Sequence, residues 1–167
     1  MLIAGMPSNV VPGDLVGAFA REGIARERLQ FHRRCGAHEY LALHQKVDIA
    51  LDAFPYPGGN VSTCALSMGV PVLTLAGSTP SSRQGAAIMG HAGLAQFVAS
   101  DADDFVRIGT QWAQDLPALA RLRAGLRDRC YASPMGHPEV IAAAVERALR
   151  TMWRRWCAGL PPESFDA

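Results

Sequence analysis

The stretch VDIALDAFPYPGGNVSTCALSMGVPVLTL, residues 47–75, decides the fold. Its first part is a compact apolar run of the kind found in buried parallel strands. A loop rich in proline and glycine follows, then a helical pattern that Gly69 ends, then a second apolar run. These four segments cover residues 47–52, 53–60, 61–68 and 71–75. A strand, a helix and a second strand in this order predict a parallel pair joined by a right-handed crossover.

The same alternation extends in both directions along the chain. Further strands are expected over residues 1–5, 28–32 and 97–99, and further helices over residues 12–22, 37–46 and 81–91. Beyond these the pattern is wholly helical, over residues 102–114, 117–131 and 138–157. We therefore predict an α/β fold, a doubly wound parallel sheet of four or five short strands with C-terminal helices.

Length and composition bound the class of protein. The 167 residues fit a single domain, 1–167, with the sheet core in about residues 1–115 and the C-terminal helices in about 116–167. Hydrophobic residues make up 49% of the chain and charged residues 19%, which excludes a disordered tail. The formal net charge of +1 lacks the positive excess that is typical of nucleic-acid binding. No nucleic-acid partner is expected.

Targeting signals and metal motifs are not evident in the sequence. No apolar run is long and uninterrupted enough for a membrane helix, and the N-terminus does not resemble a signal peptide. The four cysteines are widely spaced, form no CxxC pair, and join no Cys/His cluster with zinc-ligand spacing. We expect reduced thiols, no metal site, no membrane partner and a cytoplasmic location.

The junction after the strand at 47–52 is the richest candidate for ligand binding. Gly58 and Gly59 allow backbone to approach a ligand closely, and the amides from Asn60 to Thr63 open a helix. These donors and the helix dipole suit a phosphate or diphosphate, to which the side chains of Asn60, Ser62 and Thr63 could add hydrogen bonds. A plain helix start with solvated amides is an equally good interpretation of the residues alone.

Two further junctions carry weaker signals. After the strand at 28–32, exposed backbone could read the edge of a base, with Tyr40 or His38 stacked on its face. A half-buried helix aromatic is the commoner role for such a tyrosine. Arg83 opens the helix at 81–91 and could face a phosphate or a sugar hydroxyl, although such arginines more often pair with a surface carboxylate.

The remaining charged and aromatic residues favour structural roles. Asp101, Asp103 and Asp104 are expected to cap a helix N-terminus. Trp153 and Trp156 are expected to pack the last helix onto the sheet. No residue pair has the spacing of an acid–base or nucleophilic catalyst, so the sequence identifies no catalytic residue.

Residues 47–83 resemble the bacterial and plant relatives of the O-linked N-acetylglucosamine transferases, the SPINDLY-like group. The resemblance rests on the following motifs: DIALDAFPY at 48–56, Gly58-Gly59, MGVPVLTL at 68–75, Ser82-Arg83, YASP at 131–134 and MWRR at 152–155. It covers most of this chain but only about the last third of the family's catalytic region. It implies one Rossmann-like half of a glycosyltransferase-B fold, the half that binds the nucleotide-sugar donor.

The resemblance also implies roles for particular residues. The backbone at Gly58, Gly59, Asn60, Val61, Ser62 and Thr63 would hold the donor diphosphate, with Cys64 and Arg83 nearby. The backbone from Cys35 to Ala37 would read the base, and Tyr40 would stack on it where many relatives have histidine. The implied donor substrate is UDP-N-acetylglucosamine, with GDP-fucose as the alternative, and no separate cofactor is implied.

The sequence departs from the family at three of these positions. Val61 stands where relatives have a run of threonines after the two glycines. Ala37 replaces a lysine seen in some relatives, and Cys64 stands where relatives carry an acid that binds the ribose hydroxyls. Loss of that carboxylate–hydroxyl bond costs about 1–3 kcal/mol, or a tenfold to hundredfold loss of affinity. The family's donor-phosphate lysine, acceptor half and proposed catalytic histidine are expected to lie outside this chain.

Three functional hypotheses follow. The first is the donor-binding domain of a protein O-glycosyltransferase, active with an acceptor-binding half. The second is a truncated, non-catalytic module that binds a nucleotide or a protein partner, which Val61 and Cys64 favour. The third is a structural interaction domain with an exposed apolar patch. The sugar, the acceptor protein and the oligomeric state are left open.

Overall fold

The computed structural model describes residues 1–7 and 13–166 of the chain. The residues form two compact units, Met1–Asp48 and Ile49–Ala167, and each unit is described by itself. The expectation of a single domain over residues 1–167 stays a prediction.

The first unit is built on a parallel strand pair. Strand β1 (Leu2–Met6) pairs with β2 (Gln30–Arg33), with Leu2 opposite Gln30. Between them lie α1 (Gly13–Arg21) and the 3-10 turn η1 (Arg26–Arg28), and after β2 come α2 (Ala37–Leu43) and η2 (His44–Lys46). Leu29, Leu43 and His44 are the buried side chains of this unit among the residues described.

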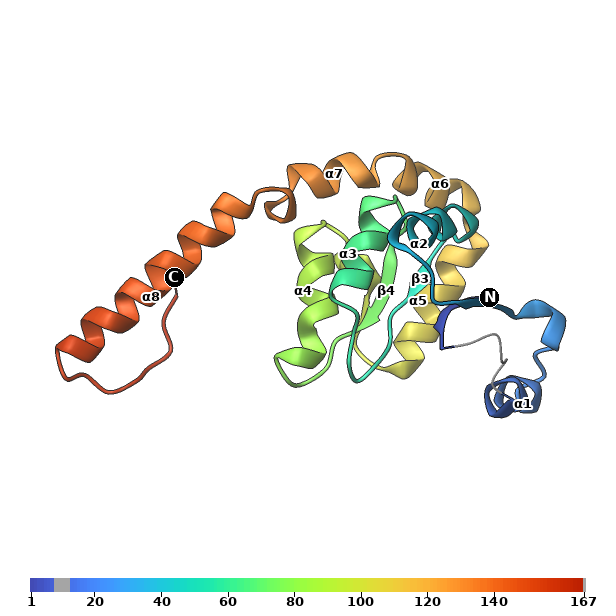
Figure 1. Ribbon diagram of the computed structural model, residues 1–167, viewed down its shortest axis with the longest axis horizontal. Helices are drawn as coiled ribbons and strands as arrows, with labels where there is room; N and C mark the ends of the chain where they lie inside the picture. Colours follow the sequence, from blue (N-terminus) through green and yellow to red (C-terminus); the bar gives the residue numbers. More distant parts are fainter. Residues whose placement is uncertain (8–12, 167) are drawn as a thin grey trace. The chain divides into compact units, whose positions relative to one another are not determined.

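The second unit contains a three-stranded parallel sheet, in the order β3 (Ala50–Leu51), β4 (Val72–Leu75) and β5 (Val98–Ala99). Helix α3 (Asn60–Ser67) connects β3 to β4. The turn η3 (Ser81–Arg83), helix α4 (Gln84–His91) and the turn η4 (Ala95–Phe97) connect β4 to β5. Helices α3, α4 and α5 (Ala102–Gln114) all contact the central strand β4 (Figure 1).

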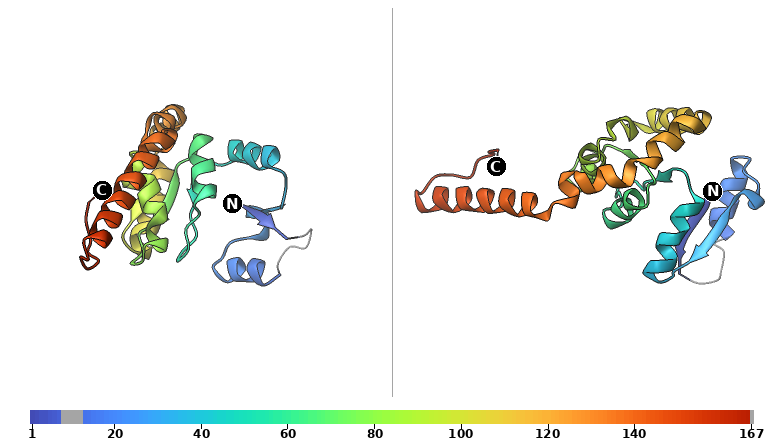
Figure 2. Two further views of the ribbon diagram at one scale, coloured as in Figure 1. Left: turned by 60° about the vertical axis from the view of Figure 1, so that its left-hand side comes forward. Right: turned by 90° about the horizontal axis from the view of Figure 1, so that it is seen from above.

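The chain ends in helices. These are α6 (Leu116–Ala124), α7 (Leu126–Ala132), the turn η5 (Pro134–Gly136) and α8 (Pro138–Cys157). The helix expected over residues 117–131 is in fact two helices, because the chain changes direction at Gly125. Helix α8 is a single continuous helix with the bounds expected from the sequence (Figure 2). No helix in the described part of the chain is long and apolar enough to cross a membrane.

The core of the second unit surrounds β4. Val72 and Leu73 of this strand are buried, and the side chains of Leu66, Met89 and Phe97 cover them from the neighbouring elements. The Phe97 ring also stacks on Trp112 of α5, with 4.8 Å between ring centroids. Full burial of side chains of this size stabilises a fold by about 1.5–3 kcal/mol each. This packing fixes where β4 ends, and therefore where the loops around the candidate site begin.

The expected fold class is confirmed: the chain is α/β, with parallel strands and C-terminal helices. Two details differ from expectation. The five strands divide between a two-stranded and a three-stranded sheet. Strand β3 is also shorter than expected, and Leu51 is 55% exposed rather than buried. Strand β3 pairs only with β4 within its sheet, so it has the exposure of an edge strand.

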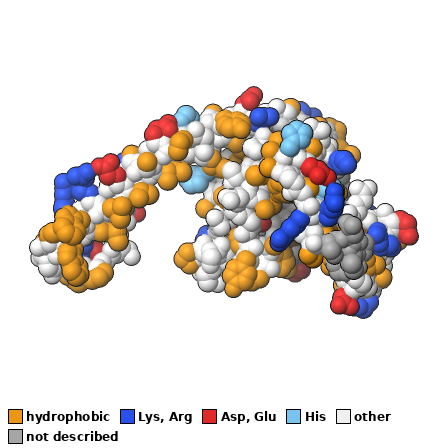
Figure 3. All heavy atoms as spheres, viewed as in Figure 1, with side chains coloured by type: hydrophobic (Ala, Val, Ile, Leu, Met, Phe, Trp, Pro, Cys, Tyr) orange, Lys and Arg blue, Asp and Glu red, His pale blue; other side chains and the backbone are white. Residues whose placement is uncertain are grey.

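The expected packing of α8 is wrong. Trp153 and Trp156 are 65% and 77% exposed, and α8 contains no buried residue. Its apolar side chains recur at helical spacing, and Figure 3 shows hydrophobic side chains gathered along it. The exposed members are Val140, Ile141, Val145, Leu149, Met152, Trp153 and Trp156. This is the kind of exposed apolar surface that the interaction-domain hypothesis predicts.

The expected acidic cap of α5 is confirmed. The side chain of Asp101 accepts a hydrogen bond of 2.8 Å from the amide of Asp104. Asp104 in turn accepts from the amide of Ser100 and from Arg107. These hydrogen bonds, that of Ser100 first, hold the pKa of Asp104 below its ordinary value.

Candidate functional site

Asp52, the residue after β3, holds the two ends of the following loop together through its carboxylate. One carboxylate oxygen of Asp52, Oδ1, accepts hydrogen bonds from the amide of Gly58 at 2.7 Å and from the amide of Ala53 at 3.1 Å. Bonds from two amides to one carboxylate oxygen are charge-assisted and therefore stronger than bonds between neutral groups. They fold the proline-rich loop back on the strand end, so that Gly58 and Gly59 lead directly into α3.

The first turn of α3 has backbone amides without acceptors in the helix. Its N-cap residue is Gly59, which has no side chain to accept from them. The first intrahelical bond runs from the amide of Thr63 to the carbonyl of Gly59, at 3.0 Å. The amides of Asn60, Val61 and Ser62 precede it and have no acceptor within the helix. Together with the helix dipole, these donors form an arrangement that can bind an anion.

The hydroxyl groups of this helix start face the protein. Ser62 is buried and donates to the carbonyl of Gly58, and the Thr63 hydroxyl donates to the carbonyl of Gly59 at 3.1 Å. Both hydroxyl protons are therefore engaged within the junction. Asn60 and Val61 are exposed, and Cys64 is half-buried one turn into the helix. Backbone amides, rather than hydroxyls, are the donors that this junction presents outward.

Close contacts bring α4 against this junction. A Cβ added to Gly59 would lie 2.8 Å from Nε2 of Gln84, the first residue of α4. A Cβ added to Gly85 would lie 2.2 Å from Oγ1 of Thr74 and 2.6 Å from Oδ2 of Asp52. Only glycine at position 85 lets α4, β4 and the end of β3 approach this closely. Sequence reasoning missed Gln84, since nothing in its local pattern distinguishes it from an ordinary helix residue.

Two buried polar atoms meet beside Gly85. They are Oδ2 of Asp52 and Oγ1 of Thr74, and neither has a hydrogen-bond partner among the described residues. An unpaired buried polar atom costs about 1–3 kcal/mol, so this pair weakens the otherwise well-packed sheet end. Asp52 thus uses one oxygen to hold the loop and keeps the other unpaired at the end of β4.

The junction after β4 is organised differently. The Thr79 amide donates to the Ser82 hydroxyl at 2.9 Å, and the Ser82 amide donates to the Thr79 hydroxyl at 3.2 Å. Arg83 is exposed and donates from Nη1 to the carbonyl of Gly77 at 3.1 Å, and its expected role toward a ligand or a surface carboxylate stays a prediction. This helix start therefore satisfies its own donors.

A pocket of about 300 Å³ lies between residues 54–56 of the loop after β3 and the junction after β4. Its lining residues are Phe54, Pro55, Tyr56, Leu75, Gly77, Ser78, Thr79 and Ser82. The loop after β3 supplies the aromatic side chains of the lining, Phe54 and Tyr56. The Phe54 ring also packs edge-on against Phe105, with 5.9 Å between ring centroids. The pocket lies beyond the carboxyl ends of β3 and β4, the end of a parallel sheet at which ligands bind in α/β folds.

The other predicted site residues lie in the first unit, at the start of α2. Cys35 is half-buried before the N-cap Gly36, and Ala37 is the first residue of the helix. Tyr40 is half-buried, and its ring packs edge-on against His44, with 5.0 Å between centroids. The structure thus groups Cys35, Ala37 and Tyr40 in one unit, and Gly58 to Cys64 with Arg83 in the other.

The sequence indicates no metal-ligand cluster, but the structure brings three potential ligands together in the first unit. His32, Cys35 and Glu39 bring their ligand atoms within 4.8 Å of one another in the first unit. The spacing His-x2-Cys-x3-Glu is the signal that could have found them, because it spans a strand end and the first turn of the next helix. The four cysteines of the chain are all free.

Comparison with known proteins gives a consistent family match. The family model "Glycosyl transferase family 41" matches residues 10–142. The probable UDP-N-acetylglucosamine–peptide N-acetylglucosaminyltransferases SPINDLY of Arabidopsis thaliana and Hordeum vulgare are each 36% identical over 125 residues. These matches cover 75% of this chain but only 14% and 13% of the two relatives. The chain therefore spans a small part of their length.

A solved structure matches the fold as well. A mutant of the Thermobaculum terrenum O-GlcNAc transferase superposes with a TM-score of 0.81 at 35% sequence identity. The match covers 87% of this chain and 28% of that protein. Both described junctions of the second unit lie within the residues that the family model covers.

Proposed function

Since this chain belongs to glycosyltransferase family 41, we propose that it is the donor-binding part of a protein O-glycosyltransferase. The reaction transfers a sugar from a nucleoside diphosphate sugar to a Ser or Thr hydroxyl of a protein. UDP-N-acetylglucosamine is the first candidate donor, because the names of the SPINDLY relatives carry that substrate. GDP-fucose is the alternative donor.

One observation carries this proposal: the helix start at α3 presents uncapped amides. Gly59 provides no side-chain cap, and Asp52 holds the preceding loop at the helix start, where Asn60 and Val61 are exposed and the amides ahead of Thr63 have no acceptor in the helix. Such a helix start favours the two negative charges of a diphosphate. The neighbouring pocket of about 300 Å³ has the size of a small-ligand site and can take a group attached to that diphosphate.

The chemical contribution of these residues is electrostatic. As the bond between the sugar and the diphosphate breaks, negative charge grows on the leaving phosphate oxygens. Amides already oriented toward those oxygens stabilise that charge without reorganising during the reaction. In the first unit, the backbone at Cys35 and Ala37 and the ring of Tyr40 are proposed to bind the base, as the family resemblance implies.

The transfer reaction needs groups that hold the acceptor protein. Because the chain spans only 14% of the Arabidopsis relative, acceptor binding and proton transfer are proposed to reside in other parts of the family's catalytic region. The partners of this chain are then a nucleotide sugar, an acceptor protein and an acceptor-binding half. We place this activity in the cytoplasm, where its thiols would stay reduced.

Calorimetric titration of the purified chain with UDP, and separately with GDP, tests the proposal. Binding of UDP in the micromolar to low-millimolar range supports a donor site for N-acetylglucosamine transfer, and preference for GDP supports fucosyl transfer. If neither nucleotide binds, the donor-domain proposal fails. A transfer assay in which the chain is mixed with an acceptor-binding half of the family then tests the reaction itself.

Two residues favour a second candidate, a non-catalytic nucleotide- or partner-binding module. Val61 is 58% exposed at the helix start, where relatives carry threonine, and Cys64 replaces the acid that binds ribose. The double substitution Val61→Thr with Cys64→Asp restores the family pattern. We expect it to strengthen UDP binding about tenfold to hundredfold if the donor site is formed. Unchanged binding would favour a module that does not recognise nucleotides.

A further inference from the structure

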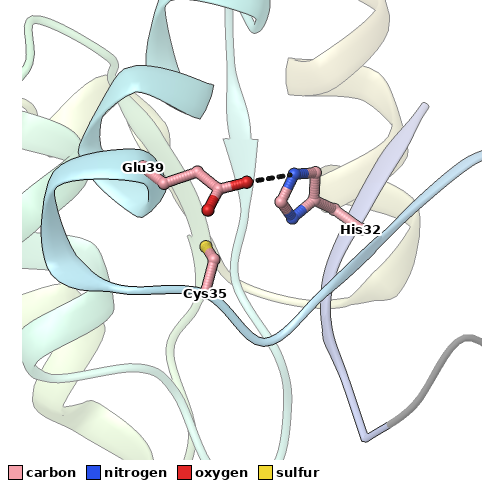
Figure 4. A group of neighbouring side chains, drawn as sticks. All are labelled: His32, Cys35 and Glu39. Atoms are coloured by element: carbon pink, nitrogen blue, oxygen red, sulfur yellow. Dashed lines mark ion pairs between the residues drawn. The ribbon is translucent and has the colours of Figure 1, made fainter.

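Three potential metal ligands meet in the first unit, and none of them is among the residues proposed to hold the diphosphate. His32 lies on β2, Cys35 in the turn that follows, and Glu39 in the first turn of α2. Their ligand atoms all lie within 4.8 Å of one another. Figure 4 shows the Cys35 thiol pointing toward the Glu39 carboxylate, with the His32 ring on the other side of that carboxylate.

The hydrogen bonds of His32 determine which ring nitrogen is available. Nδ1 lies 2.9 Å from the carbonyl oxygen of Arg33, which can only accept, so Nδ1 carries a proton and donates it. In a neutral ring Nε2 then has a lone pair, and it lies 3.4 Å from Oε1 of Glu39. Two acceptors that face each other repel, and a positive charge between them makes the contact favourable.

This arrangement matches that of histidines that bind metals. A metal-bound imidazole almost always donates its second ring N–H to a carbonyl or carboxylate, which fixes the tautomer and the ring orientation. Here the carbonyl of Arg33 has that role and leaves Nε2 as the ligand atom. Cys35 adds a thiol that faces the Glu39 carboxylate (Figure 4). A proton on Nε2 could satisfy the His32–Glu39 pair alone, but a thiol beside it completes a ligand set for a metal ion.

We propose that His32, Cys35 and Glu39 bind one divalent cation of the zinc class. Imidazole nitrogen, thiolate sulfur and carboxylate oxygen are the ligands that Zn²⁺ takes in proteins. Two ligands of a tetrahedral zinc ion lie about 3.3–3.7 Å apart, given zinc–ligand bonds of about 2.0–2.3 Å. The 3.4 Å between Nε2 of His32 and Oε1 of Glu39 already fits, and the Cys35 sulfur lies within 4.8 Å of the other two ligand atoms.

The site has an entry path and an open coordination position. The side chains of His32 and Glu39 are 25% and 54% exposed, so an ion can reach them from solvent. Three protein ligands leave the fourth position of a tetrahedral ion to water or to another ligand. The thiol of Cys35 loses its proton to solvent when it binds the ion. This proposal does not rest on the donor-binding function.

Titration of the full chain with Co²⁺ alone tests the proposal. Co²⁺ in a tetrahedral site with a thiolate ligand gives visible d–d bands and a near-ultraviolet charge-transfer band from sulfur to cobalt. We expect both bands to saturate at one Co²⁺ per chain and to disappear when Zn²⁺ is added. A wild-type chain without the charge-transfer band overturns the proposal, and this readout needs no variant to fold.

Ligand substitutions then assign the band to these residues. Substitution of a group that merely orients a ligand weakens metal affinity about 10–100-fold, so Cys35→Ser, His32→Gln or Glu39→Gln should each weaken Zn²⁺ binding at least about 100-fold. The matched controls are Cys157→Ser and His91→Gln, an exposed thiol and an exposed imidazole of the second unit. Unchanged affinity in Cys35→Ser, or equal loss in Cys157→Ser, overturns the proposal.

Discussion

Two helix starts lie close together in the second unit, where Gly59 is next to the Gln84 side chain, and their backbone amides are bonded differently. At the start of α3, Gly59 has no side chain to cap the helix, and the amides ahead of Thr63 have no acceptor within the helix. At η3, Ser82 and Thr79 bond each other's amides, and Arg83 bonds the loop carbonyl of Gly77. The amides at the start of α3 are therefore available to an anion. Those of Thr79 and Ser82 are bonded within their own junction, which supports the start of α3.

The comparison shows how a rigid neighbour makes an open site possible. Uncapped amides are costly unless a ligand or water binds them. The junction after β4 and the packing of α4 through Gly85 hold the α3 start in place despite that cost. Substitutions in the junction after β4 or at Gly85 should therefore change the free energy of unfolding. Substitutions at the start of α3 should change ligand affinity.

The largest effect is expected at Gly85. In Gly85→Ala the new Cβ would meet Thr74 and Asp52 at distances that no real Cβ contact shows, so buried groups must move. Overpacking of this kind costs about 1–3 kcal/mol, and the free energy of unfolding measured by urea denaturation should fall by that amount.

Gly90→Ala is the matched control for this substitution. Gly90 lies in the same helix with open space around its Cβ position. The control should be neutral or stabilise by about 0.4–1 kcal/mol, because alanine reduces the entropy of the unfolded chain. Equal stability of the two variants would contradict the proposed close packing of α4.

Asp52 should give the next largest effect, on stability and ligand binding together. Asp52→Ala removes the charge-assisted bonds to Gly58 and Ala53, but it also removes the unpaired buried oxygen Oδ2, so the free energy of unfolding should fall by about 1–2 kcal/mol in all. Loss of the loop should also weaken UDP binding in calorimetry. Asp52→Asn keeps an acceptor for the amides and adds a donor beside Thr74 Oγ1. It should therefore be clearly more stable than Asp52→Ala, and similar stabilities would exclude the loop-closing role.

Ser82 tests the supporting junction alone. Ser82→Ala removes the acceptor of the Thr79 amide and should lower the free energy of unfolding by about 1 kcal/mol. UDP affinity should stay unchanged once the folded fraction is accounted for, because the outward amides belong to the other junction. A large loss of affinity in folded Ser82→Ala would show that the second junction binds the ligand itself.

The smallest effect is expected at the cap of α5. The lowered pKa of Asp104 means that its charged form stabilises the fold above the ordinary pKa of 3.8, and this stability is lost as the pH falls through the lowered folded value. Asp104→Asn should thus lower the Tm slightly near neutral pH and not in strong acid. Asp103→Asn, in the same helical turn, is the control. A Tm difference that persists in strong acid would contradict this origin.

The sequence predicts the elements of the second unit well because local signals define them. Glycine and proline bound the loop after β3, Gly69 follows the end of α3 with a positive φ of 73°, and the strand at 72–75 is apolar apart from Thr74. The ligand-binding potential of residues 58–63 also follows from the order of strand, glycines and helix. These features depend on neighbours in the sequence.

The features that sequence reasoning missed depend on partners far along the chain. Nothing local indicates that Gln84 lies against Gly59 or that Asp52 and Thr74 meet beside Gly85. The exposure of Trp153 and Trp156 was missed for a related reason: an amphipathic pattern predicts an apolar face, but does not identify what covers it. His32, Cys35 and Glu39 were missed because their spacing crosses from a strand into a helix.

The most direct test of the central claim is an amide NMR titration of the isotopically labelled chain with UDP. The amide resonances of Asn60, Val61 and Ser62 should shift along one saturable curve, while those of Ser82 and Arg83 stay nearly unchanged. Inorganic pyrophosphate should move the same three resonances, because the amides recognise the anion. Shifts confined to the junction after β4, or no shifts at residues 60–62, would contradict a diphosphate site at the start of α3.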